Sequence, residues 1–452
     1  MIHKIIQSLR ENIVLIVVVC IVISASIFRI QTYGDVRLSI AGNDTQSYIT
    51  ASQVPLFSSE MLSGRRLLTT NLLYKIFEPQ AGYEILVNGS IETTRRVVQP
   101  SFVDIIILQL ALSLIGWGML SMVVAKYLKN SLLKVLSTII ILVFAFAPQI
   151  ADWDSILLSE SLTFSLFAVA LAILIQIVFL LFKNQNTNIT GWLAFYLFVF
   201  VIWTFLRDTN LFISVVNISL ICVLYFLPSY RKNKVLHFAV ALFVFIFIVG
   251  LMTASQSTRS QVQLVNIYRD DLLVSPLRTE ILTEMGMPDS DSTEFQPWFN
   301  ENASTTLIKF MLKHPGYPIT KILNDFPWAF TEIEQTYFKA PELKTREALI
   351  TIGDALHPQN MTPFFVGLLL LIGLIQLSIK NIGNSRAWAW NALWLFLTAT
   401  LMLIPTILGD TWALNRHALL STTIYRLCMW LFAIIIIDIA LEKNSQPTQI
   451  TY

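Results

Sequence analysis

The chain has 452 residues, of which 55% are hydrophobic and only 13% are charged, and its mean hydropathy is +0.64. A soluble domain carries roughly 25% charged residues, so the composition excludes an ordinary soluble protein. The net charge of +2 gives no support for nucleic acid as a partner. Cys20, Cys222 and Cys428 all lie in apolar runs, so we expect no disulfide framework.

Runs of about 20 apolar residues recur along the chain, each long enough to cross a bilayer core of about 30 Å. The first run follows a basic N-terminus and is too long for a signal peptide, which predicts an uncleaved span that starts inside. We expect an all-α membrane protein with about ten transmembrane helices. In chain order they are 13–30, 102–125, 133–148, 159–182, 191–206, 211–227, 236–253, 363–379, 388–408 and 421–441.

Short connections between these spans alternate in charge. The basic ones contain Lys126, Lys129, Lys134, Arg231, Lys232, Lys234, Lys380 and Arg386. The acidic ones contain Asp152, Asp154, Asp208 and Asp410. Basic loops stay in the cytoplasm, so the acidic loops should share the outer face, with both chain ends inside.

Two long polar segments fall on that same outer face. The pattern predicts a transmembrane core over 1–253 with a long first outer loop at 31–100. An extracytoplasmic helical segment, 254–361, follows, and its prolines predict short helices that lie on the membrane surface and roof the site. Residues 362–452 should form the last transmembrane helices and a cytoplasmic tail.

The first candidate site residues follow span one. Asp44 and Tyr48 are four residues apart, so on a helix both would face one cleft. Asn43 or Asp44 could instead be only a helix N-cap, since both residue types favour that position. Farther along, Asp152 and Asp154 occupy a short outer loop, where acids could bind a divalent cation or only be solvated. Glu160 enters an apolar run, where a lone carboxylate is disfavoured.

Basic residues at other span ends suggest phosphate binding. Arg207 could grip a phosphate through two parallel hydrogen bonds, or it could snorkel or pair with Asp208. Arg416 and His417, in a loop opened by Asp410, could bind a phosphate headgroup. Arg426 lies inside an apolar run and should need a buried carboxylate or phosphate partner. We expect the paired basics of the first outer loop to be solvated or to touch lipid phosphates: Arg65, Arg66, Arg95 and Arg96.

The order of these features resembles the GT-C superfamily of integral-membrane glycosyltransferases. Its members open with one span and a long outer loop, which bears an acidic residue and often a tyrosine about four residues on, as Asp44 and Tyr48 do here. DWDSILLSESLTFSLF resembles the second acidic loop, RDTNLF the arginine after span five, and GD-x5-RH a late motif of several bacterial members. The stretch SGRRLLTTNLLYKIF departs from the family, which usually has prolines there.

The resemblance implies transfer of a sugar from a polyprenyl-phosphate donor to an acceptor glycan, lipid or protein, with inversion, at the outer face of a bacterial inner membrane. Asp44 would be the general base. Arg207, Arg416 and His417 would stabilise the departing phosphate, while Asp152, Asp154 and Glu160 would orient the acceptor or a Mg or Mn ion. No cofactor is certain, and Asp410 and Tyr48 would complete the cleft.

Three other functions remain open. An O-antigen-type polymerase or ligase also has about ten spans and a large late outer loop with Arg and His, but generally lacks a long acidic loop after span one. A transporter or flippase for a lipid-linked sugar would need charges and helix breaks near mid-bilayer, whereas here the charges fall at span ends. A scaffold whose acids only cap helices is the third.

Overall fold

The computed structural model describes residues 2–42, 44–86, 96–183, 189–257, 259, 261–333 and 344–445. Helices make up 77% of the structure. The strands of the described chain, β1 (Leu38–Ser39) and β2 (Val97–Val98), pair antiparallel over two residues each. The expected all-α class is therefore confirmed.

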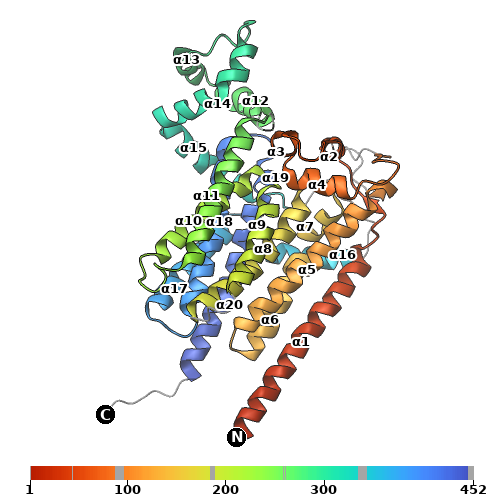
Figure 1. Cartoon of the computed structure of the whole chain (residues 1–452), viewed down its shortest axis with the longest axis vertical. Coiled ribbons are helices and arrows are strands. Elements are labelled where there is room, and N and C mark those ends of the chain that lie inside the picture. The colour runs from red at the N-terminus through yellow and green to blue at the C-terminus, as the bar shows by residue number, and fades with distance from the viewer. Residues whose placement is uncertain are drawn as a thin grey trace.

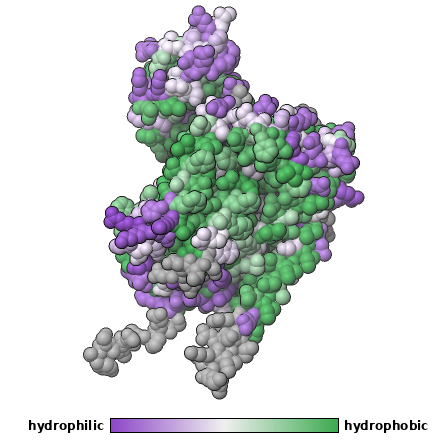
Figure 2. Space-filling view, viewed as in Figure 1, coloured by the Kyte–Doolittle hydropathy of each residue, from purple (hydrophilic) through white to green (hydrophobic). Residues whose placement is uncertain are grey.

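Long apolar helices pack side by side and give the molecule its main body (Figure 1). They are α1 (Ile2–Tyr33), α5 (Val103–Tyr127), α6 (Ser131–Phe146), α8 (Glu160–Phe182), α9 (Ile189–Thr204), α10 (Phe212–Leu224), α11 (Lys234–Ser255), α17 (Thr362–Ile379), α18 (Ser385–Gly409) and α20 (Leu419–Ser445). These helices correspond to the ten expected spans. A band of apolar side chains crosses this body, with polar surfaces at both ends (Figure 2), as a membrane-spanning bundle requires.

Within the described residues, seven helices are long and apolar enough to cross a membrane. An eighth span is possible if α6 continues into α7 (Pro148–Ala151) and η2 (Asp152–Ser155), at a bend of 51°. Pro148 causes the bend, because the residue before a proline is driven out of the helical region; Ala147 has ψ 151°. The helices α9 and α10 are shorter, and 16 residues of α9 rise about 24 Å.

α8 is the central helix of the bundle. Of its most apolar stretch, 89% is buried inside the protein, against 11% for α1 at the edge. Gly116 lets α5 approach α8 closely, because a Cβ at this position would lie 2.7 Å from the carbonyl oxygen of Ser165. Small residues serve the same purpose at helix contacts inside membranes generally. The packing of α8 at the centre of the bundle thus fixes the position of its first residue, Glu160.

The polar segments gather at one end of the bundle, and α1 begins and α20 ends at the other (Figure 1). From the first segment come α2 (Thr45–Ser52), α3 (Glu60–Ser63), α4 (Leu68–Ile76) and η1 (Pro100–Phe102). Short elements join the long helices at this end: η4 (Asp208–Leu211) and α19 (Leu414–His417). All sequence-predicted outer connections therefore share one end of the molecule.

The segment expected to form separate surface helices folds differently. A lobe rises beyond the bundle (Figure 1) and comprises α12 (Gln261–Ile267), η5 (Tyr268–Leu272), α13 (Pro276–Glu284), α14 (Phe295–Lys313) and α15 (Gly316–Asp325), followed by η6 (Trp328–Phe330). The lobe has its own apolar core, which includes Tyr268, Leu272, Leu282, Phe299 and Phe310. Burial of these side chains explains why the helices pack on one another. The last helix, α16 (Lys344–Leu356), packs against α6 and α7 instead.

Candidate active site

A cleft of about 510 Å³ opens at the polar end of the bundle, between the tops of α8 and α18, the first outer segment and α12. Five arginines and four carboxylates are among its described lining residues. The arginines are Arg65, Arg66, Arg207, Arg259 and Arg416, and the carboxylates are Asp44, Glu160, Asp208 and Asp410. Tyr48 and His417 also line it. The structure therefore brings together most of the residues singled out in the sequence.

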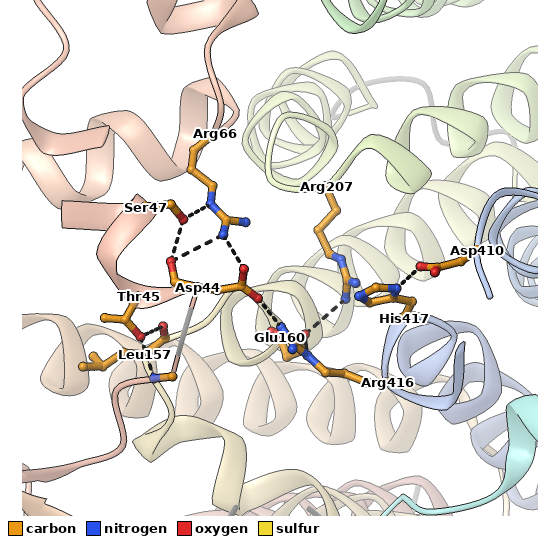
Figure 3. Close-up of polar contacts among 11 residues, drawn as sticks. Asp44, Thr45, Ser47, Arg66, Leu157, Glu160, Arg207, Asp410, Arg416 and His417 are labelled. Carbon is orange, nitrogen blue, oxygen red and sulfur yellow. Dashed lines mark hydrogen bonds and ion pairs between the residues drawn. The ribbon is translucent and has the colours of Figure 1, made fainter. Parts of the chain in front are cut away.

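Asp44 lies directly before α2, but its side chain makes no capping hydrogen bond to the helix. The N-cap alternative is thus not realised at Asp44, and Asn43 lies outside the described residues. Instead, Oδ1 accepts from Arg66 at 3.0 Å and Oδ2 from Arg416 at 2.9 Å (Figure 3). Burial disfavours the ionised carboxyl, but the charges of Arg416 and Arg66 outweigh burial and hold the pKa of Asp44 below its usual value. Its side chain keeps 41% of its surface exposed, so a ligand can reach it.

Arg66 was expected to be solvated or to touch lipid phosphates, but the structure pairs it with Asp44 inside the cleft. Besides Asp44, its Nε donates to Ser47 Oγ at 2.7 Å, and its guanidinium lies 4.1 Å from the centre of the Tyr48 ring. The positive charge over an aromatic face is itself favourable. The preceding residue, Arg65, is exposed and also lines the cleft. A basic pair that follows the acidic motif after two short helices was the signal that could have placed Arg66 here.

Of the other paired basics, Arg96 lies apart from the cleft, and Arg95 is outside the described residues. Arg96 donates to the carbonyl oxygen of Tyr33 at 2.8 Å and to Ser155 Oγ at 3.3 Å. It thus holds the end of α1 against η2.

Glu160 is the first residue of α8 and only 2% exposed. Two effects stabilise its charge. The helix N-terminus favours a negative group, and Arg416 donates to Oε1 at 3.1 Å (Figure 3). Arg416 therefore links two carboxylates of the cleft, Asp44 and Glu160. Burial alone would lower the pKa of Arg416, but the pKa is raised above its usual value. This raised value reflects the attraction of the carboxylates, which outweighs the opposing effect of burial.

Arg207 is held more loosely at these carboxylates than Arg66 and Arg416 are. Its Nη1 lies 3.9 Å from Glu160 Oε1, beyond hydrogen-bond range. The expected alternative, a pair with Asp208, is not formed, because Asp208 binds Arg259 at 3.1 and 3.2 Å. Arg207 points toward Glu160 and His417 (Figure 3). Its guanidinium is therefore the one best placed to accept an anionic ligand.

Asp410 and His417 form the far wall of the cleft. Oδ2 of Asp410 contacts Nδ1 of His417, and Oδ1 accepts from the backbone N–H of Trp412 at 3.0 Å. Asp410 is 4% exposed, whereas 27% of the His417 side chain is exposed. The carboxylate orients the imidazole, so that its Nε2 edge is the one left for a ligand. Ala413 closes this turn in the left-handed region, at φ 51° and ψ 39°.

Asp152 and Asp154 do not line the cleft. The helix η2 turns them into the protein, where both are buried. Asp154 binds Arg29 at 3.1 Å and Ser161 at 2.6 Å, and Asp152 binds Arg346 at 2.5 Å. The placement differs from the expected role in orienting an acceptor or metal. Within the described residues no group of three or more His, Cys, Asp or Glu is arranged for a metal, and each aspartate already faces an arginine, so these residues do not fit a cation.

Arg426 also departs from expectation. Among the described residues its hydrogen bonds go to backbone carbonyls, Pro358 at 3.0 Å and Phe330 at 2.7 Å, and not to a carboxylate. The side chain is fully buried. It ties α20 to η6 and to the loop before α17, which is a structural role.

Comparisons with known proteins find similarity at the level of structure but not of sequence. No family model matches the chain, and no curated protein matches it. Among solved structures, it is similar to the archaeal oligosaccharyltransferase AglB from Archaeoglobus fulgidus, in complex with an inhibitory peptide and a dolichol-phosphate, at a TM-score of 0.47 and 10% identity. The match covers 96% of this chain and 53% of that protein, so this chain spans about half its length.

Proposed function

We propose that this protein is a membrane glycosyltransferase, which moves a sugar from a polyprenyl-phosphate donor to an acceptor hydroxyl, with inversion at the anomeric carbon. The observation that carries the proposal is the cleft itself. A reachable carboxylate, Asp44, stands beside Arg416 and the loosely held Arg207 at the polar end of the apolar bundle. A lipid-linked phosphate needs this combination of an apolar neighbourhood for its chain and arginines for its headgroup.

The donor phosphate would bind between Arg207 and Arg416, with His417 beside it. Both guanidiniums reach Glu160, which is buried and holds them on one side of the cleft. Because Arg207 has only a 3.9 Å contact to this carboxylate, it can bind a phosphate without breaking a hydrogen bond to Glu160. Preorganised positive charge of this kind stabilises the charge that develops on the leaving phosphate.

Chemistry then needs a proton acceptor. The acceptor oxygen attacks the anomeric carbon, the bond from that carbon to the phosphate oxygen breaks, and its electron pair leaves with the polyprenyl phosphate. The hydroxyl proton passes to Asp44. Arg416 now lowers the basicity of Asp44, and a donor phosphate that draws Arg416 away would restore it. Donor binding would thereby prepare the base.

The placement of the charges bears on the transport alternative. Glu160 is the first residue of α8, Arg207 directly precedes η4, and Asp410 directly follows α18. All three lie at helix ends, whereas a transporter places its substrate groups at discontinuous helices near the midplane. This favours transfer at the surface over passage through the bundle.

The test is Asp44→Asn, compared with Asp35→Asn. Asp35 is a matched control, because it is an outer-segment carboxylate paired with Arg37 at 3.0 Å, outside the cleft. We expect Asp44→Asn to fold and to bind donor at least as tightly, since a competing negative charge is removed, and to lose transfer by about 10²–10⁴-fold. Purified proteins would be assayed for release of polyprenyl phosphate from a panel of labelled polyprenyl-phosphate sugars. Wild-type rates in Asp44→Asn would contradict the proposed base.

A further inference from the structure

A second hollow, of about 440 Å³, lies in the outer lobe, and no role has been given to it above. One wall is a single face of α15 that continues into η6, because its residues recur at helical spacing: Tyr317, Thr320, Asn324 and Trp328. The opposite wall is η5, with Asp270 and Asp271, and Thr411 closes the hollow toward the bundle. The volume is within the range of small-molecule sites, which is about 300–1,000 Å³.

Two chain segments connect this hollow to the catalytic cleft. Asn266 lines the cleft, and Asp270, one helical turn farther along the same α12–η5 helix, lines the hollow. In the turn after α18, Asp410 and Trp412 line the cleft and Thr411 between them lines the hollow. Neighbouring Cα atoms are about 3.8 Å apart, so the two spaces lie on either side of the same short chain segments.

Both connecting segments have unusual backbone. η5 is a π-helix, a form that is rare and frequent at functional sites. Ala413 ends the other segment at φ 51°, a left-handed conformation that a non-glycine residue adopts only at a cost. Strained backbone of this kind concentrates at ligand sites. The backbone thus departs from α-helical geometry in both segments that lie between the hollow and the cleft.

The charges of the hollow largely satisfy one another. Lys321 binds Asp325 at 2.7 Å and lies 3.5 Å from Asp271. Asp271 also accepts from Tyr317 at 2.7 Å and binds Arg278. The lining groups for which the structure describes no side-chain hydrogen bond are neutral: the hydroxyl of Thr320, the amide of Asn324 and the half-exposed indole of Trp328, 43% exposed. A neutral ligand with many hydroxyls and an apolar ring face fits this set, and an anion does not.

We propose that this hollow is a binding site for the sugar rings of a neutral oligosaccharide acceptor, one or more units away from the hydroxyl that reacts. The proposal rests on the proposed function for the direction of transfer. Trp328 would pack against a ring face, and Thr320 and Asn324 would hydrogen-bond its hydroxyls. The ligand is the acceptor because the donor lipid must stay with the apolar bundle. The hollow is lined mainly by residues of the lobe, whose surface is more hydrophilic than that of the bundle (Figure 2).

The experiment measures binding without turnover. Purified protein in detergent would be tested by saturation-transfer NMR against neutral tetrasaccharides of glucose, mannose and N-acetylglucosamine, and against a hydrophilic peptide of similar size. We expect at least one tetrasaccharide to bind, and Trp328→Ala to weaken it by about tenfold. Leu323→Ala is the matched control, since Leu323 is 70% exposed on α15 but does not line the hollow.

The variant Asp44→Asn separates this proposal from the proposed function. It should bind the tetrasaccharide like the wild type, because Asp44 lies in the cleft and not in the hollow. Thr411→Val, which changes the side of the hollow nearest the bundle, should weaken binding as well. Failure of every tetrasaccharide, equal binding by wild type and Trp328→Ala, or binding of the peptide alone would each overturn the proposal, whatever the activity of Asp44 variants.

Discussion

At the scale of single residues, the cleft is organised by competition among charges. Arg416 serves both Asp44 and Glu160, at 2.9 and 3.1 Å, while Arg207 reaches only Glu160 and only at 3.9 Å. The buried carboxylate therefore sets the position of both arginines, and the exposed carboxylate remains available for chemistry. Glu160 is buried and contacts both arginines, so in the proposed reaction it positions them. Asp44 is more exposed, so it is the carboxylate that takes the proton.

Arg207→Lys tests the phosphate grip. Lysine keeps the charge but loses the planar two-pronged contact, so we expect donor turnover to fall by about 10–100-fold, the loss of one strong charge-assisted contact. The assay is release of polyprenyl phosphate, with thermal stability measured in parallel. Arg37→Lys, in an exposed pair with Asp35, should behave as wild type. Equal activity of Arg207→Lys and wild type would leave Arg207 a structural residue.

At the scale of elements, helix ends are tied by buried ion pairs. Arg29, near the end of α1 and 1% exposed, donates to Asp154 at 3.1 Å and to the carbonyl oxygen of Ala151 at 2.7 Å. α1 is otherwise the least embedded of the long helices. The pair thus fixes α1, and with it the outer segment that carries Asp44, against η2.

Asp154→Asn distinguishes this tether from a catalytic role. Removing one charge of a buried pair leaves the other uncompensated, which costs about 3–5 kcal/mol. We therefore expect a large loss of thermal stability, with the remaining folded protein still active. The double change Arg29→Met with Asp154→Leu should recover much of that stability, because apolar residues replace a buried pair well. A stable but inactive Asp154→Asn protein would instead indicate that Asp154 takes part in catalysis.

At the scale of the whole molecule, the chain separates a polar working end from an apolar body. The first outer segment, the turns before η4 and after α18, and the lobe all meet at that end, opposite the start of α1 and the end of α20 (Figure 1). Charge alternation predicts that this end faces the outside. A donor carried in the outer leaflet would then reach the cleft from the side of the bundle.

Single cysteines test this orientation in a background in which Cys20, Cys222 and Cys428 are replaced by alanine. Gln80→Cys and Thr293→Cys, both exposed at the polar end, should react with an impermeant thiol reagent in intact cells. Lys232→Cys, in the exposed connection between α10 and α11, should react only after permeabilisation. Labelling in the reverse pattern would invert the orientation of the protein and of the proposed active site.

The sequence alone determined the membrane body, because apolar length is a local property. All ten expected spans are apolar helices. Single residues cap the starts of two of these helices: Asn130 caps α6 by accepting from the N–H groups of Leu132 and Leu133, and Asn233 caps α11. The sidedness of charge also predicts that Asp44, Glu160, Arg207 and Arg416 lie on the same face of the membrane. These four do share one cleft in the structure.

Tertiary structure decided which charges meet, since an ion pair depends on distances that loop composition does not encode. Asp152 and Asp154 have the same local sequence character as Asp44, yet η2 buries them against Arg346 and Arg29. Arg66 looked solvated because its partners Asp44 and Tyr48 lie some 20 residues earlier and across a turn of chain. The lobe acquired a core because aromatic residues far apart in sequence pack together only after the chain folds back on itself.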